Sequence, residues 1–112
     1  MASLATFACT APSSEAGPFS VQLFADAGQG PVERNILVSS GTNALQATEQ
    51  AFDVQTQSFS FGKMVSSING IASDSNHYWA LYVDGNYSLQ GAESVLVDRN
   101  LVILWKLEPL SQ

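Results

Sequence analysis

One segment of the sequence has helical periodicity, and it separates two stretches in which apolar and polar residues alternate. At the start of residues 43–54, Asn43 and Gln46 have the spacing of a capping box, a motif that marks the start of a helix. The positions that then share one helical face are Ala44, Leu45, Thr48, Ala51 and Phe52. A lone helix with one apolar face has to bury that face on a sheet. We therefore expect an α+β fold, with the helix lying on a sheet built from the flanking stretches.

Seven segments have the apolar, aromatic and β-branched pattern of strands; they are residues 19–23, 35–39, 57–61, 64–68, 77–83, 86–89 and 101–107. Asn69-Gly70 and Asp84-Gly85 are typical of tight hairpin turns. We expect residues 25–31 to form the loop of a first hairpin, because glycines and a proline gather there. The order of elements predicts a β-grasp-like fold, with one helix packed on a mixed β-sheet and extra β-hairpins.

The last predicted strand, residues 101–107, indicates which of its faces is buried. Alternate residues of a strand point to opposite faces. Because Lys106 is the most polar member, the face that carries Ile103 and Trp105 is expected to meet the helix. Val102 and Leu104, on the other face, are expected to lie beneath loops or a partner.

The composition excludes several classes of protein. With 112 residues the chain has the length of one domain. The net charge is −6 and the four basic residues are scattered along the chain, which excludes the phosphate contacts of a nucleic-acid binder. One histidine and one cysteine exclude a disulfide framework and a Cys/His zinc site within one chain. No stretch approaches the roughly 20 apolar residues of a transmembrane helix.

Residues 1–17 differ from the rest of the chain. They are small and apolar and then polar, and they lack the basic residue that a complete secretory signal requires. Two interpretations stay open: the end of a lipoprotein signal with Cys9 as the lipid-anchored residue, or a disordered start whose first three residues derive from cloning. We expect a disordered linker over residues 1–17, a folded domain over residues 18–109 and a short tail over residues 110–112. Such a linker is typical of secreted, periplasmic or cell-surface proteins.

Three motifs follow one another in the second half of the chain: residues 62–70 (GKMVSSING), residues 78–85 (YWALYVDG) and residues 88–92 (SLQGA). In order and spacing they resemble the C-terminal β-domain of the transcobalamin and intrinsic-factor group, a domain that also occurs in bacterial surface proteins. The resemblance covers residues 18–109, and the expected helix sits where that family places its helix. The resemblance implies the same β-grasp-like fold.

The resemblance also implies a site. In cobalamin transporters this β-domain closes over one face of the corrin ring, while a large helical domain supplies the other face. The contact positions carried over from the family are Phe61, Met64, Ser88 and Leu89, with Trp79 in the intervening strand. The resemblance therefore implies binding of cobalamin or another corrinoid, with a second domain or subunit needed for tight binding. No histidine stands at these positions, so metal coordination by this surface is not supported.

The tyrosines of residues 77–83 suggest a different surface. Tyr78 and Tyr82 share one face of that strand and Trp79 and Leu81 share the other, so one pair is expected to point away from the core. Trp79 fits a core position as well as a ligand contact. An exposed tyrosine pair favours a second hypothesis, a cell-surface interaction or adhesion module that pairs through a sheet edge or its aromatic face.

No residue pattern indicates catalysis. The carboxylates available for paired acid–base chemistry are Asp74, Asp84, Glu93 and Asp98, and turns and loops account for most of them. The lone histidine, His77, is expected to be exposed where a loop meets the strand of residues 77–83, which leaves no histidine for a serine triad. We therefore predict a non-enzymatic domain that binds a small-molecule ligand or a protein partner.

Overall fold

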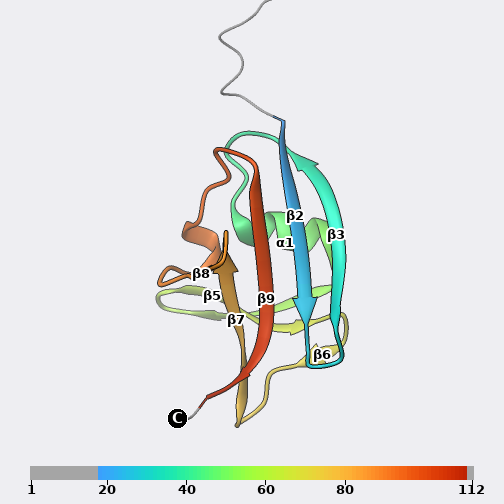
Figure 1. Cartoon of the computed structure of the whole chain (residues 1–112). Coiled ribbons are helices and arrows are strands. Elements are labelled where there is room, and N and C mark those ends of the chain that lie inside the picture. The colour runs from blue at the N-terminus through green and yellow to red at the C-terminus, as the bar shows by residue number, and fades with distance from the viewer. Residues whose placement is uncertain (1–17, 111–112) are drawn as a thin grey trace, which may run out of the picture.

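The computed structural model describes residues 18–110. The expected linker of residues 1–17, with its anchor residue Cys9, and residues 111–112 lie outside the described residues. The described chain forms β2 (Phe19–Asp26), β3 (Pro31–Val38), α1 (Ala44–Ala51), β4 (Val54–Phe59), β5 (Gly62–Ile68), β6 (Ile71–Ala72), β7 (His77–Val83), β8 (Asn86–Tyr87), the short 3-10 helix η2 (Ala92–Ser94) and β9 (Leu101–Pro109). One α-helix among strands confirms the predicted α+β class (Figure 1).

The larger of two sheets is mixed, as predicted. Its strand order is β3-β2-β9-β7-β8, so the first and last strands of the described chain lie side by side in its middle. β2 and β9 run parallel, with Leu23 opposite Ile103, whereas the other neighbours in this sheet pair antiparallel. The remaining elements lie between β2 and β9 in the sequence, which provides the long connection that a parallel pair requires.

The helix α1 and the smaller sheet β4-β5-β6 cover one face of the larger sheet (Figure 1). Their apolar residues share one core, in which Leu45 of α1 and Ile68 of β5 join Leu81 of β7 and Ile103 of β9. No described element crosses the opposite face of the larger sheet (Figure 1). The cleft described below forms where the smaller sheet reaches the edge of the larger one.

Helix α1 begins where the sequence predicts. Asn43 Oδ1 accepts a hydrogen bond from Gln46 N–H at 2.8 Å, and Gln46 Oε1 accepts one from Asn43 N–H at 3.0 Å, so the capping box is complete. The helix ends at Ala51 rather than near residue 54. It ends early because Val54 already pairs with Ile68 at the start of β4.

The first hairpin is longer than predicted. A loop is expected over residues 25–31, but β2 runs to Asp26 and β3 begins at Pro31, which leaves residues 27–30 for the turn. Ala25 continues the inward-facing positions of β2 and is 6% exposed. Because this small residue is buried, β2 continues past residues 19–23, the stretch in which apolar and polar residues alternate.

The two faces of β9 differ as predicted. Ile103 is fully buried, and Trp105 is 4% exposed and meets α1, where its indole N–H donates to Thr48 Oγ1 at 2.9 Å. Lys106 points to the opposite, exposed face. Val102, expected beneath loops or a partner, is 39% exposed among the described residues, because no described element covers this face.

Candidate functional site

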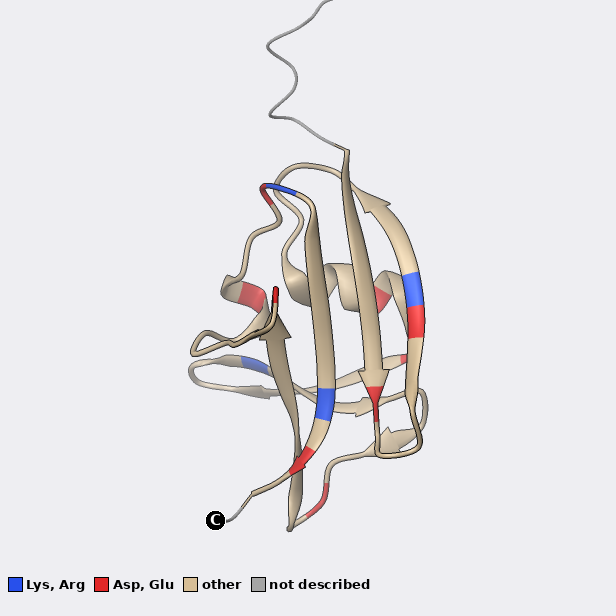
Figure 2. Cartoon of the chain, viewed as in Figure 1, with Lys and Arg blue, Asp and Glu red and all other residues tan. Residues whose placement is uncertain are grey.

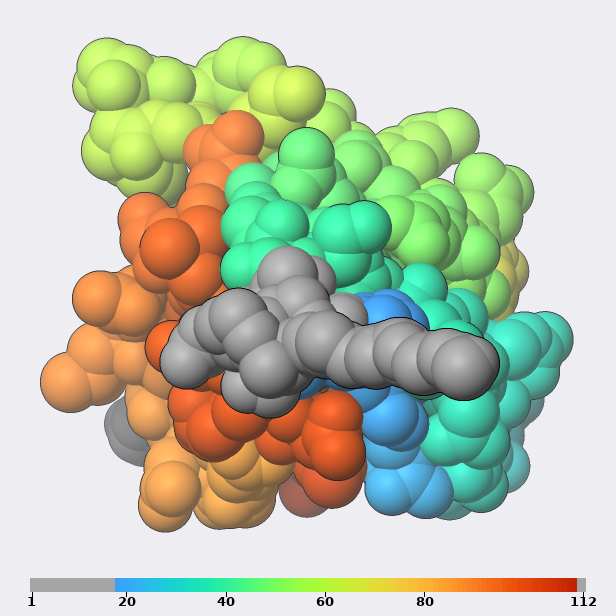
Figure 3. All heavy atoms as spheres, turned by 90° about the horizontal axis from the view of Figure 1, so that it is seen from above, coloured from blue at the N-terminus to red at the C-terminus, as the bar shows by residue number. Residues whose placement is uncertain are grey.

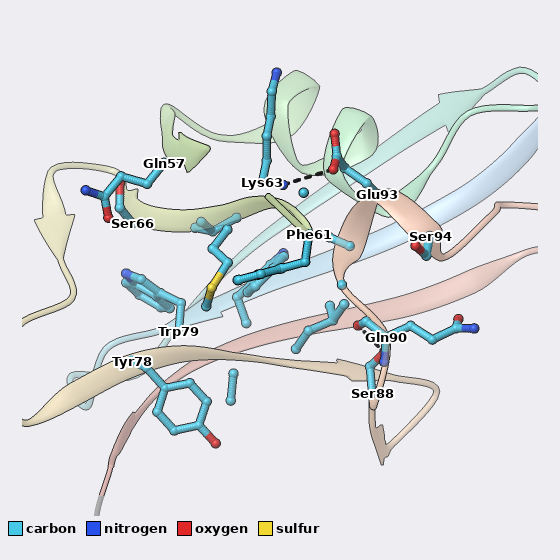
Figure 4. Close-up of a pocket in the computed structure, with 18 of the residues that line it drawn as sticks. Gln57, Phe61, Lys63, Ser66, Tyr78, Trp79, Ser88, Gln90, Glu93 and Ser94 are labelled. Carbon is cyan, nitrogen blue, oxygen red and sulfur yellow. Dashed lines mark hydrogen bonds between the residues drawn. The ribbon is translucent and has the colours of Figure 1, made fainter. Parts of the chain in front are cut away.

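A cleft of about 430 Å³ opens between the smaller sheet and the edge of the larger one. Its walls are the β4–β5 hairpin, β7 and residues 87–94 (Figure 4). Viewed from above, the hairpin projects from the body of the domain beside the segment around residues 88–94 (Figure 3). Six of the seven residues nominated from the sequence line the cleft; they are Phe61, Met64, Tyr78, Trp79, Ser88 and Leu89. The volume falls within the roughly 300–1,000 Å³ of small-molecule pockets.

The tip of the β4–β5 hairpin carries an exposed aromatic pair. Phe59 and Phe61 stack face to face, with ring centroids 5.2 Å apart and ring planes 1° from parallel. Phe61 is 74% exposed, and Phe59 and Met64 are each 46% exposed. Met64, which also lines the cleft, adds a polarizable thioether to the same wall. This wall can pack on a flat apolar ligand by dispersion.

The opposite wall presents Leu89, which is 95% exposed. Ser88 Oγ donates to Gln90 O at 2.9 Å and accepts from Gln90 N–H at 3.2 Å, while Ser88 N–H donates to Leu81 O at 2.9 Å. These bonds turn the chain, so β8 ends at Tyr87 rather than at Leu89 as expected. Ser88 therefore shapes the loop, and Leu89 supplies the apolar surface of this wall.

Trp79 forms the floor of the cleft. It is 6% exposed, and its indole N–H donates to Ile71 O at 3.0 Å. A buried tryptophan whose N–H is satisfied is a core residue. Trp79 is thus a core residue, which is one of the two roles that the sequence suggests for it, and it also borders the cleft.

One hydrogen bond joins two walls of the cleft. Glu93 Oε1 accepts from Lys63 N–H at 3.0 Å (Figure 4). A Cβ added to Gly62, which has φ 131°, would lie 2.9 Å from the same oxygen, so glycine lets the carboxylate approach the hairpin. The sequence alone does not reveal this role of Glu93, because the two segments are 30 residues apart and no local motif links them.

Tyr82, the seventh nominated residue, belongs to a tyrosine cluster on the opposite face of the larger sheet. Tyr82 Oη donates to Glu108 Oε2 at 2.6 Å, and its ring meets the edge of the Tyr87 ring with centroids 5.6 Å apart. Tyr78 Oη donates to Tyr87 Oη at 3.3 Å, and this bond, with desolvation, raises the pKa of Tyr78 to about 12. Tyr78 and Tyr87 border the cleft at the edge of β7, whereas Tyr82 does not line it. The nominated residues therefore form two adjoining surfaces.

Charged groups are sparse at the cleft. Acidic and basic residues are scattered over the domain and in places lie next to each other (Figure 2), and Lys63 and Glu93 are the charged members of the described lining. Away from the cleft, His77 Nδ1 lies 3.1 Å from Asp74 Oδ1. The hydrogen bond from the backbone N–H of Asn76 lowers the pKa of Asp74 most, and the hydrogen bond with the His77 side chain lowers it further.

Within residues 18–110, no group of three or more His, Cys, Asp or Glu residues could hold a metal ion. None of the described helices has the length and apolar character needed to cross a bilayer.

The fold is shared with proteins of known structure. Haptocorrin in complex with Cbi matches with a TM-score of 0.76 and 20% sequence identity, over 83% of this chain and 25% of the haptocorrin chain. A protein of Ruminococcus gnavus ATCC 29149, described as a candidate metal-binding protein, matches with a TM-score of 0.74 and 12% identity, over 83% of this chain and 99% of that chain. At these identities the likeness shows the fold alone, which this chain shares with part of haptocorrin and with the Ruminococcus gnavus protein. The chain spans a quarter of the length of haptocorrin.

No curated protein matches the sequence. A family described as a domain of unknown function, DUF4430, matches residues 41–109, from the start of α1 to the end of β9. The match therefore includes the whole smaller sheet, part of the larger sheet and the whole described lining of the cleft. Because it extends over more than half of the chain, the protein belongs to the DUF4430 family.

Proposed function

We propose that this protein is a non-enzymatic ligand-binding domain whose cleft takes a large flat small molecule, with cobalamin or another corrinoid as the first candidate. The haptocorrin structure that shares this fold holds Cbi. The family positions nominated as ligand contacts, Phe61, Met64, Ser88 and Leu89, all border the cleft. The proposal includes the finer assignment of the chain to the C-terminal β-domain type of that group.

The observation that carries the proposal is the exposed apolar surface on both sides of the cleft. Phe61 is 74% exposed in a stacked pair with Phe59, and Leu89 is 95% exposed on the other wall. Large apolar side chains that ordered turns keep exposed to water raise the free energy of the protein, and contact with a ligand that covers them lowers it. A flat apolar molecule inserted between the walls removes this surface from water.

A second domain or subunit completes the site in this proposal. Small-molecule pockets bury about 70–90% of their ligand, and an open cleft at the edge of one small domain covers less. The chain spans 25% of haptocorrin, so the remainder of that protein has no counterpart in this chain. We place the protein outside the cytoplasm, as a secreted, periplasmic or cell-surface domain, with Cys9 as a candidate lipid anchor.

Equilibrium dialysis of the full chain against cobalamin and cobinamide tests the proposal. Retention is expected at about 1 mM protein, the range in which one wall alone can hold a ligand weakly. Phe61→Ala is expected to weaken retention about fivefold. Leu37→Ala is the matched control, because Leu37 is 66% exposed on β3 at the far edge of the larger sheet. An absence of retention overturns the corrinoid assignment.

A second candidate function is an interaction or adhesion module that uses a sheet edge or the aromatic face. The uncovered face of the larger sheet supports it, because Tyr87 is 48% exposed and Val102 is 39% exposed there. β3 adds an edge strand, exposed along most of its length. Light scattering over a range of protein concentrations tests self-association, and a monomer at the highest concentration counts against pairing between copies.

A further inference from the structure

Strand β7 lacks a neighbour along part of the edge that borders the cleft. On one side it pairs with β9 over its whole length, whereas on the other side β8 covers only Tyr82 and Val83. Residues 78–81 line the cleft. The backbone edge of β7 therefore faces the cleft over the stretch that β8 leaves open (Figure 4).

The bonds at the end of β7 show which backbone groups point toward the cleft. In an antiparallel pair, alternate residues bond the partner strand, and the residues between them direct N–H and C=O to the other side. Asp84 N–H donates to Val102 O at 2.8 Å on the β9 side, and Ser88 N–H donates to Leu81 O at 2.9 Å on the other side. Even-numbered residues of β7 therefore bond β9, and Trp79 and Leu81 direct their backbone groups toward the cleft.

Three of these groups have no hydrogen-bond partner within the described part of the chain: Trp79 N–H, Trp79 C=O and Leu81 N–H. The fourth, Leu81 C=O, is satisfied by Ser88. Trp79 and Leu81 are each only 6% exposed, so bulk water has little access to them. Unpaired backbone groups at buried residues are rare in native proteins, because each one forfeits a hydrogen bond that it made in water. Ser88 already lies opposite Leu81, but the donor and the acceptor of Trp79 are the two groups that one residue of an antiparallel strand bonds.

We propose that this edge of β7 takes an extended peptide segment as an added antiparallel strand. The peptide residue opposite Trp79 accepts from Trp79 N–H and donates to Trp79 C=O. The peptide begins after Ser88, which already lies opposite Leu81 and bonds its C=O. The proposal rests on the proposed function only in that the cleft is the binding site, and it adds a class of ligand that the backbone edge itself recognises.

The side chains around the edge define the peptide further. Successive side chains of an added strand point to opposite faces. On the face that Trp79 shares they meet the wall of Phe61 and Met64, and on the other face they meet Tyr78 and Tyr87. Both surfaces are apolar or aromatic, and the chain carries a net charge of −6. The fitting peptide is therefore apolar or aromatic at successive positions and uncharged or basic overall.

Backbone amide exchange measured by NMR on the free protein tests the premise. The amide protons of Trp79 and Leu81 are expected to exchange about a hundredfold faster than those of Ala80 and Tyr82, which bond β9 on the same strand. Equal protection of the odd-numbered and even-numbered residues would show that the edge is already satisfied and would overturn the proposal.

Random linear heptapeptides displayed on phage are the probe for the binding step. Peptides selected on the full chain are then synthesised and titrated by NMR. They are expected to protect the Trp79 amide from exchange. N-methylation of the peptide residue opposite Trp79 is expected to weaken binding about tenfold, because it removes one backbone hydrogen bond. Methylation of the next residue, whose N–H points away from β7, serves as the control.

Two charge substitutions locate the peptide. Met64→Glu places a carboxylate in the cleft and is expected to weaken peptide binding about tenfold. Leu37→Glu, at the far edge strand β3, is expected to leave binding unchanged. Both residues are exposed, at 46% and 66%, so both variants should fold. Loss of binding in Leu37→Glu alone moves the peptide to β3 and overturns the proposal, as does a selection that yields no peptide protecting the Trp79 amide. A failure to retain corrinoids in dialysis, by contrast, affects only the proposed function.

Discussion

Trp105 and Thr48, 57 positions apart in the sequence, share a buried hydrogen bond of 2.9 Å from the indole N–H to the threonine hydroxyl. The same hydroxyl donates to Ala44 O at 2.7 Å, so one threonine satisfies both the indole of β9 and a carbonyl of its own helix. Thr48 is fully buried and Trp105 is 4% exposed. This pair fixes where along β9 the helix lies.

Replacing Thr48 by valine removes the acceptor and keeps the shape. The indole N–H of Trp105 is then buried without a partner, which is expected to lower the free energy of unfolding by about 1–3 kcal/mol. Thr48→Ser keeps the hydroxyl and loses one methyl group, with an expected cost of about 1 kcal/mol. Urea denaturation followed by tryptophan fluorescence measures both, and equal losses would mean that packing rather than the hydrogen bond carries the effect.

Phe52 tests whether the helix holds the sheet. It is 6% exposed in the shared core, with the guanidinium of Arg34 5.9 Å from its ring centroid. Truncating Phe52 to alanine is expected to cost about 3–5 kcal/mol through lost burial and a cavity. Tyr82→Ala is the comparison on the uncovered face and is expected to cost much less. Chemical denaturation decides between them, and a near-neutral Phe52→Ala contradicts the packing of α1 on the sheet.

Glu93 is expected to hold the β4–β5 hairpin in place over the cleft. Glu93→Ala removes the acceptor of Lys63 N–H, and amide exchange in residues 59–63 should accelerate about tenfold while the core strands stay protected. Glu93→Gln retains an oxygen acceptor and should leave most of the protection. Gly62→Ala, whose Cβ would crowd the same carboxylate oxygen, should mimic the loss. Unchanged exchange in Glu93→Ala would mean that packing alone holds the hairpin.

The tyrosine cluster makes stability sensitive to alkaline pH. The pKa of Tyr78 is raised to about 12, first by its hydrogen bond to Tyr87, and the pKa of Tyr82 is raised by its bond to Glu108. Folding thus favours the neutral phenols, so their contribution is complete below about pH 10 and is lost as the pH rises through the folded pKa.

Absorbance titration of tyrosinate in the folded protein measures this effect. Tyr87→Phe removes the acceptor of the Tyr78 hydroxyl, so the pKa of Tyr78 should fall back toward about 10. Unfolding curves at successive pH values should show stability falling more steeply above about pH 10 in the native chain than in this variant, which lacks the shift of the Tyr78 pKa. A native protein in which all tyrosines titrate together near their ordinary pKa would contradict the hydrogen bonds of the cluster.

Features set by neighbouring residues could be predicted from the sequence. The capping box of Asn43 and Gln46 forms as its spacing indicates. Asn69 and Asp84 adopt φ of 53° and 51° at the two predicted tight turns. These elements depend on side chains and backbone groups a few positions apart, so a short stretch of sequence contains the information that specifies them.

Features set by distant residues could not be predicted in the same way. The spacing predicts one mixed sheet with extra hairpins, but it does not show that β4, β5 and β6 separate into a sheet of their own. Nor does it reveal that Glu93 reaches Lys63 across 30 residues. Most of the residues nominated from the sequence line the cleft, whereas Tyr82 lies outside it and bonds Glu108 on the opposite face of the larger sheet. Such relationships depend on how whole elements pack.

The parallel pairing of β2 and β9 sets how the domain responds to mechanical force. The two strands are in register over six residue pairs, from Val21 opposite Leu101 to Asp26 opposite Lys106. Tension applied between Phe19, at the start of β2, and Pro109, at the end of β9, pulls the strands past each other along their length. The hydrogen bonds between the two strands then resist the force together, in shear. In a hairpin that is pulled open from one end, the hydrogen bonds break one at a time. Under pulling, the barrier to unfolding sets the lifetime of the fold, and this geometry raises that barrier in the middle of the larger sheet.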